Sequence, residues 1–247
     1  MFAYARSIKG KKMDVNDDAF ITEEMGDFMI LMVADGNGGR PGMPCIGRIA
    51  CEIVMDFIEK AVNNKPDITV GEMQPVLDAA FYSASRTFRV LNAVDRRFEN
   101  VYASLACMVI STISHRMILA STGNCEVQMW RKLKFSRLNR LHTEAFRKLE
   151  SSKIQERDYY IDPGRNLLTS ALGYIDQPDV DILPGTLKEG EVLLFVSDGV
   201  FQFLNPDDIL ATLSEKDSPT AGVDAVLDKL AENEEAENCT LMCLYVD

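Results

Sequence analysis

The chain has 247 residues, of which 47% are hydrophobic, and its 26 basic and 38 acidic residues give a formal net charge of −12. This acidic balance argues against nucleic acid as a partner, because the phosphates of a nucleic acid attract a basic surface. No apolar run is long enough to span a bilayer, and residues 1–6 lack the pattern of a secretory signal, so we expect no membrane partner and a cytoplasmic location.

The composition is even along the chain. No linker rich in proline, glycine or serine divides it and no internal repeat occurs, so we expect a single domain that covers residues 1–247. The six cysteines form no CxxC pair, and several of them fall in apolar patterns. This distribution favours buried free thiols over disulfides.

Apolar segments separated by polar breaks predict the elements in the first half of the chain. Residues 19–22 and 28–33 are expected to form a β-hairpin with its turn at 23–27. A glycine-rich loop follows at 37–44. Apolar residues at helical spacing then predict two helices. These two helices are expected near residues 49–63 and 76–91.

From residue 103 the apolar residues recur with a period of two, which predicts consecutive antiparallel strands. These strands are expected at residues 103–112, 117–121, 126–130 and 134–139. Later elements are a helix at 144–153, strands at 180–183 and 192–196, helices at 206–213 and 221–231, and a strand at 240–246. Segregated runs of strands and helices favour an α+β fold. The expected architecture is a four-layer α/β/β/α sandwich, with two antiparallel β-sheets flanked by helices.

Two apolar segments far apart in the chain end in the same way. Residues 28–36 end in Asp35-Gly36, and residues 191–199 end in Asp198-Gly199. A continuous apolar run bounded by glycine is typical of a strand buried on both faces, so each aspartate is expected where a central strand ends. An unpaired carboxylate is costly at such a place. Two of them therefore suggest a shared cation.

Further acids precede predicted strands. Asp17 and Asp18 lie just before the strand that starts at residue 19, and Glu237 lies before the last strand. Hard cations such as Mg²⁺ and Mn²⁺ prefer oxygen ligands of this kind and keep several waters. Taken singly, each acid is equally typical of a solvated turn. His115 and His142 are too isolated for a zinc site, and His115 is expected in a surface turn.

Six short motifs occur in a characteristic order. They are Asn16-Asp17-Asp18-Ala19, Val33-Ala34-Asp35-Gly36-Asn37-Gly38-Gly39, Gly123-Asn124-Cys125-Glu126, Thr169-Ser170-Ala171-Leu172-Gly173, Ser197-Asp198-Gly199-Val200 and Glu237-Asn238-Cys239-Thr240. This order resembles that of the metal-dependent Ser/Thr protein phosphatases of type 2C, the PPM family, and most resembles divergent bacterial members. The resemblance extends nearly from end to end, and it implies a β-sandwich with two Mn²⁺ or Mg²⁺ ions at one end.

The resemblance also implies roles for the acids. Asp35 would bridge both ions, and Asp198 and Glu237 would hold the first. Asp17 and the carbonyl of Gly36 would hold the second. Two ions about 3.5–4 Å apart lower the pKa of a bridging water and neutralise the phosphate during in-line attack. The implied activity is the hydrolysis of phosphoserine and phosphothreonine in proteins, in signalling.

Several residues with expected catalytic roles depart from the family's pattern or lie beside a departure. Asp18 would orient a metal-bound water, as the family's aspartate does. Met13 occupies the position where the family has an arginine that binds the phosphate. Lys12 is therefore expected to bind the phosphate instead, although a lysine lacks the bidentate fork of arginine. Asn37 replaces a histidine that is a candidate general acid, and it cannot donate a proton to a leaving group. Asn124 replaces an aspartate.

These departures leave alternatives open. The first is a working phosphatase, whose partners are a phosphorylated protein and a cognate Ser/Thr kinase. The second is a catalytically weak or inactive phosphatase-like domain that binds a phosphoprotein or another partner as a regulatory module. The third is hydrolysis of a different phosphomonoester.

Basic residues concentrate in one region of this acidic chain. They are Arg131, Lys132, Lys134, Arg137, Arg140, Arg147, Lys148, Lys153, Arg157 and Arg165. They indicate either a solvated face or a patch that meets an anionic partner such as a phosphorylated substrate.

Overall fold

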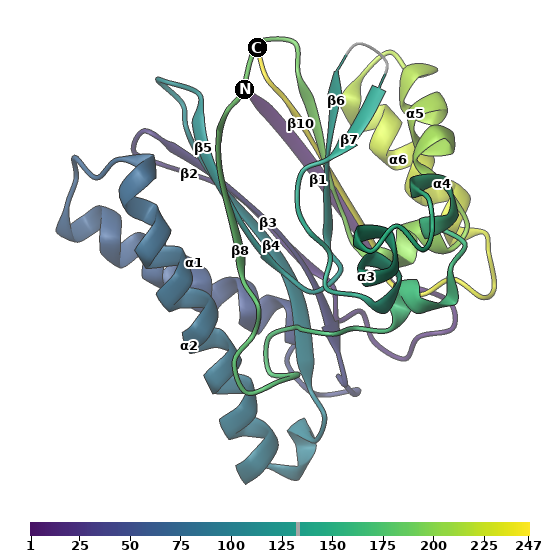
Figure 1. Cartoon of the computed structure of the whole chain (residues 1–247), viewed down its shortest axis with the longest axis horizontal. Coiled ribbons are helices and arrows are strands. Elements are labelled where there is room, and N and C mark those ends of the chain that lie inside the picture. Colours follow the sequence, from purple (N-terminus) through teal and green to yellow (C-terminus); the bar gives the residue numbers. More distant parts are fainter. Residues whose placement is uncertain (132–133) are drawn as a thin grey trace.

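The computed structural model describes residues 1–131 and 134–247 (Figure 1). Within these ranges, two five-stranded antiparallel sheets form the centre of the molecule. Helices cover the outer face of each sheet (Figure 1). The predicted α+β sandwich is confirmed.

The first sheet carries the predicted hairpin and the central strand that ends near Asp35. Its order is β2-β3-β4-β5-β8, with β2 (Ala19–Met25), β3 (Phe28–Asn37), β4 (Tyr102–Ser111), β5 (Arg116–Thr122) and β8 (Asp181–Thr186). Strand β3 is buried on both faces because it lies between β2 and β4, with helices on one side and the second sheet on the other.

The second sheet joins the two ends of the described chain. Its order is β1-β10-β9-β6-β7, with β1 (Phe2–Ile8), β10 (Cys239–Tyr245), β9 (Val192–Val196), β6 (Glu126–Arg131) and β7 (Lys134–Arg137). Strand β1 was not predicted, because its half-buried residues make no apolar run.

The sequence pattern predicted that the strands after residue 103 follow one another as consecutive antiparallel strands. In the structure these strands divide between the two sheets. Strands β4 and β5 pair in the first sheet, whereas β6 and β7 pair in the second. The chain crosses between the sheets at Gly123, whose φ of +87° is readily adopted only by glycine. The period-two pattern is local to each strand, so it does not identify the sheet to which a strand belongs.

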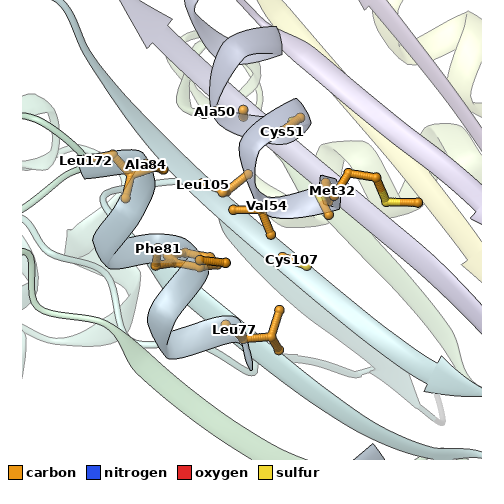
Figure 2. Packing of buried hydrophobic residues seen from close by; sticks show 14 of the residues in the cluster. Met32, Ala50, Cys51, Val54, Leu77, Phe81, Ala84, Leu105, Cys107 and Leu172 are labelled. Atoms are coloured by element: carbon orange, nitrogen blue, oxygen red, sulfur yellow. The ribbon is translucent and has the colours of Figure 1, made fainter. Parts of the chain in front are cut away.

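Two long helices pack on the first sheet, as predicted. They are α1 (Ile46–Asn64) and α2 (Met73–Val94). Figure 2 shows Val54 of α1 and Phe81 of α2 among the buried side chains that meet Met32, Leu105 and Cys107 of the sheet. The helices thereby bury the outer face of β3 and β4.

The second sheet has its own pair of helices, α5 (Pro206–Ser214) and α6 (Pro219–Ala231). Val223 and Leu227 of α6 belong to the buried cluster that also contains Leu194 and Leu241 of the sheet. Between the two sheets, Leu31 and Phe195 lie in a third buried cluster. The sheets therefore pack face to face.

The stretch between β7 and β8, residues 138–180, is called the flap segment below. It contains α3 (Glu144–Glu150), α4 (Glu156–Tyr159) and the 3₁₀ helix η3 (Pro163–Asn166). Helix α3 ends earlier than the predicted residue 153, because Ser152 has a positive φ of 57°. The helices α3 and α4 of the flap segment lie near α5 and α6 in Figure 1.

Two further predictions concern the whole chain. All six cysteines are free, and all are buried except Cys45, which is half-buried. His115 lies in the turn between β4 and β5. No described helix combines the length and the apolar character that a membrane crossing requires.

Candidate metal centre

A cavity of about 220 Å³ opens where β3 and β9 end and β10 begins. Asp35, Asp198 and Glu237 all line it. Asp35 is near the end of β3, and Asp198 begins the 3₁₀ helix η4 (Asp198–Gln202) directly after β9. The structure thus brings the two Asp-Gly sequences to one place.

A close backbone approach places Asp198 beside Glu237. A Cβ atom on Gly199 would lie 2.1 Å from the carbonyl oxygen of Asn238, which no side chain tolerates. Glycine at this position lets η4 pack against the start of β10. The two acids thereby reach the same cavity.

Asp35 is the most strongly perturbed acid of the centre. Burial raises its pKa well above the usual value, and the nearby charges of Asp198 and Asp18 raise it further. Its neighbour Gly36 is buried and also lines the cavity. A cation bound here would offset the repulsion among the carboxylates.

Asp18 is held by hydroxyl groups from the second sheet. The hydroxyl of Ser197 donates to Asp18 Oδ2 over 2.7 Å, and that of Thr240 donates to the same oxygen over 2.8 Å. Burial nevertheless raises the pKa of Asp18 to about 7. Because Asp18 also interacts with Asp35, its carboxylate belongs to the acidic centre.

We expect the metal-free protein to lose stability as the pH rises from about 4 to 7. Asp18 has a folded pKa of about 7 against an ordinary value of 3.8, so the folded state binds this proton more tightly than the unfolded state. Its contribution is complete below the ordinary pKa and is lost as the pH rises through the folded pKa.

The variant Asp18→Asn tests this expectation, because its side chain can still accept from both hydroxyls. In EDTA, the free energy of unfolding of the variant relative to wild type should rise on the order of a few kcal/mol between pH 4 and pH 7.5. Urea denaturation at each pH gives the difference. A difference that does not change with pH would contradict the assignment.

Asp17 occupies a different position from the other acids. Its carboxylate accepts from the backbone N–H of Gly39 over 2.7 Å and from that of Ile46 over 3.2 Å. Ile46 is the first residue of α1, and the preceding residue Cys45 offers no side-chain cap. Asp17 therefore serves as an N-terminal cap for α1 from a distant part of the chain.

Asp17→Ala should lower the free energy of unfolding by about 2 kcal/mol, because it removes a charged cap and leaves two N–H groups without their acceptor. Asp14→Ala is the matched control, since Asp14 is exposed. Urea denaturation of both variants in EDTA separates this effect from metal binding. Equal stability of the two variants would argue against the capping role.

Glu237 lies between acidic and basic neighbours. Burial and the charge of Asp198 raise its pKa, whereas Lys12 and Arg165 oppose this shift. Arg165 is only 8% exposed, and its Nη1 donates to the carbonyl oxygen of Asp198 over 3.0 Å. Arg165 belongs to the basic stretch of the sequence, and no residue pattern predicts this contact between positions 33 residues apart.

The cavity wall contains neutral side chains at two of the positions discussed above. Met13 and Asn37 both line the cavity, but Lys12 does not. Lys12 is half-exposed, and its Nζ lies 3.7 Å from Glu235. Asn124 donates from Nδ2 to Asp198 Oδ2 over 2.6 Å, so it fixes one oxygen of that carboxylate.

The chemistry of these side chains fits a hard divalent cation. Carboxylates such as those of Asp18 and Asp35, with pKa values raised by desolvation and by neighbouring acids, are the oxygen donors that Mg²⁺ and Mn²⁺ prefer. In residues 1–131 and 134–247, however, no three His, Cys, Asp or Glu side chains are already arranged around one point. Binding would therefore require small side-chain rotations, with waters completing the shell.

The basic region is largely neutralised by its own acids. Arg140 lies 2.6 Å from Glu150, and Lys148 lies 2.8 Å from Asp162. Arg131, Arg137, Arg147 and Arg157 also have carboxylates within 4.0 Å. Lys132 lies outside the described residues. The side chains of Arg137 and Arg165 are buried, so the region is not one continuous surface patch.

Comparison with known proteins gives the same fold. No protein-family model matches the chain. The serine/threonine phosphatase stp of Listeria monocytogenes is 20% identical over 249 residues, covering 100% of this chain and 96% of that protein. The PPM Ser-Thr phosphatase MsPP of Mycobacterium smegmatis superposes with a TM-score of 0.77 at 18% identity, over 100% of this chain and 99% of that one. The resemblance to the PPM family is confirmed.

Another PPM-like structure bears on the centre. The catalytic domain of the phosphatase PstP, solved in complex with two manganese ions, superposes with a TM-score of 0.73 at 17% identity. It covers 100% of this chain and 98% of that chain. At this identity the likeness establishes the fold alone.

Proposed function

We propose that the protein hydrolyses phosphoserine and phosphothreonine esters in proteins, with divalent cations held at the cavity described above. The observation that carries this proposal is the convergence of Asp35, Asp198 and Glu237 on one cavity of a PPM fold. The full-length similarity to a serine/threonine phosphatase supports the same activity. The protein is then a metal-dependent protein phosphatase.

The proposed ligands follow from the cavity. Asp35 would contact two ions, Asp198 and Glu237 would hold the first, and the Gly36 carbonyl would take part in holding the second. When bound, Mn²⁺ or Mg²⁺ would lower the pKa of a water and offset the charge of the phosphoryl group. Asp18, whose carboxylate interacts with Asp35, orients the attacking water.

Asp17 was expected to hold the second ion, and its contacts favour a different role. Both oxygens of its carboxylate already accept from backbone N–H groups. We therefore propose that Asp17 fixes the loop after Gly36 against α1. Through that loop, it sets the direction of the Gly36 carbonyl.

Substrate binding should depend on the ions to an unusual degree. Among the described residues, no lysine or arginine lines the cavity. A phosphoryl dianion that enters the cavity therefore meets Asp35 and Glu237 without a cationic side chain to offset them. We expect phosphate to bind measurably only when the ions are present.

The decisive experiment measures phosphate release from a phosphothreonine peptide and from p-nitrophenyl phosphate, with Mn²⁺ and with EDTA. Hydrolysis of both substrates that requires the ion is the expected result. Calorimetry with Mn²⁺ on the same preparation reports binding without turnover. If Mn²⁺ binds and neither substrate is cleaved, the alternative of a phosphoprotein-binding module replaces the proposed activity.

The sequence supports proposals on the substrate, the partner, the ion and the location. A phosphoprotein is the proposed substrate, and a cognate Ser/Thr kinase is the proposed partner. Manganese and magnesium are both suitable ions by their ligand chemistry. The cytoplasmic location stays a prediction.

A further inference from the structure

Hydrolysis of a phosphoserine or phosphothreonine ester leaves an alkoxide, which is a strong base and a poor leaving group. A positioned acid that protonates it contributes typically 10²–10⁴-fold to the rate. Asn37 occupies the position of the expected acid, and an amide cannot supply this proton. The centre therefore needs another proton donor, if the proposed function holds.

The register of the first sheet places a candidate proton donor beside Asn37. Tyr102 is the direct partner of Asn37 across the β3–β4 ladder, two positions from the pair of Asp35 with Ser104. Tyr102 is half-buried and lines the same cavity as Asp35 and Asp198. Asn37 cannot donate the proton, but its partner on the opposite strand, Tyr102, carries a phenol that can.

The hydroxyl of Tyr102 is free to act in this way. It makes no hydrogen bond with any other described residue. Tyr174, which does not line the cavity, packs against the ring of Tyr102. The two ring centroids are 5.2 Å apart at an angle of 68°. This edge-to-face contact orients the phenol without occupying its oxygen.

The remaining donors on the cavity wall are weaker candidates. The hydroxyl of Ser104 already donates to Asn124 Oδ1 over 2.6 Å. The other donors are the amides of Asn37, Asn124, Asn166 and Asn238, which do not transfer protons to an alkoxide. The carboxylic groups are the proposed ligands of the ions and would be ionised when the ions are bound. Burial raises the pKa of the Tyr102 phenol above its ordinary value, so the phenol remains protonated at neutral pH.

We propose that Tyr102 is the general acid of this centre and protonates the seryl or threonyl oxygen as it leaves. In this step the water oxygen forms a bond to phosphorus while the bond from phosphorus to the ester oxygen breaks. The electron pair of the broken bond stays on the ester oxygen, which takes the phenolic proton. The phenolate then regains a proton from solvent, and the proton lost by the water also goes to solvent.

The test compares two leaving groups in the variant Tyr102→Phe. An alcohol is a far weaker acid than phenol and needs the proton, whereas p-nitrophenolate is stable enough to leave without it. With Mn²⁺ saturating, kcat for the phosphothreonine peptide should fall about 10²-fold. The kcat for p-nitrophenyl phosphate should stay within about threefold of wild type. A series of aryl phosphates should show a steeper dependence on leaving-group pKa in the variant.

Tyr174→Phe is the matched control, because it removes a hydroxyl from the ring partner and is expected to change neither rate. Equal losses on both substrates in Tyr102→Phe, or no loss on the peptide, would overturn the role of Tyr102 and leave the proposed function intact. Failure of the wild type to cleave either substrate with Mn²⁺ would overturn the proposed function, and this role with it. Thermal melting of each variant verifies that it is folded.

Discussion

Asp35→Asn is expected to reduce Mn²⁺-dependent hydrolysis of the phosphothreonine peptide by about 10³-fold or more. The carboxylate of Asp35 is the proposed bridge between the ions, and metal ions supply several kcal/mol of transition-state stabilisation in such reactions. Calorimetry should show a parallel loss of Mn²⁺ affinity. Steady-state kinetics at saturating Mn²⁺ measures the loss of rate.

The same variant should be more stable than wild type when metal is absent. Its substitution removes a buried carboxyl whose pKa is raised by burial and by Asp198 and Asp18. Higher stability in EDTA together with lower activity separates a functional defect from misfolding. Asp78→Asn, on the exposed face of α2, is the matched control and should leave both quantities unchanged. Retained activity in Asp35→Asn would contradict the proposed centre.

Glu126→Ala is expected to lower the free energy of unfolding by about 3–5 kcal/mol. Glu126 Oε1 lies 3.0 Å from Arg137 Nε, and the two side chains are only 1% and 8% exposed. The hydroxyl of Tyr160 donates to the same carboxylate over 2.7 Å. The alanine variant would leave a buried guanidinium with Glu156 as its remaining carboxylate partner. Urea denaturation in EDTA measures the change.

A second variant identifies the cause of this loss. Removing both charges in Glu126→Ala/Arg137→Met should recover much of the stability, because the buried cation is then absent as well. Glu144→Ala breaks the exposed pair with Arg147 and should cost less than about 1 kcal/mol. A Glu126→Ala effect no larger than that of Glu144→Ala would show that the buried pair contributes little.

The fold was largely predictable because apolar patterning reports burial directly. Residues 28–34 form a continuous apolar run, and β3 is indeed buried on both faces. The helices α1 and α2 follow from the same signal. Strand β1 escaped prediction because its side chains are half-buried, and partial burial leaves no alternation strong enough to detect. The assignment of β6 to the second sheet depends on tertiary pairing, which local patterns do not encode.

The centre was predictable only in part. The two Asp-Gly sequences predicted that Asp35 and Asp198 lie close together, and both line one cavity. This was predictable because each aspartate lies near the end of a buried strand. The capping role of Asp17 depends on α1, whose first residue is 29 positions away. Arg165 donates a hydrogen bond to the backbone carbonyl of Asp198, and a sequence pattern does not predict such a contact. The position of Tyr102 beside Asn37 depends on the pairing of β3 with β4, which the sequence does not show.

The hydroxyl contacts of Asp18 have a consequence for the order of events during synthesis. Thr240 lies 222 positions after Asp18, and Ser197 lies 179 positions after it. Contacts between such distant positions form late, because long loops must close first. A nascent chain that has not yet released β10 from the ribosome has Asp18 without the hydroxyl of Thr240. The proposed centre is therefore complete only when β10 has joined the second sheet.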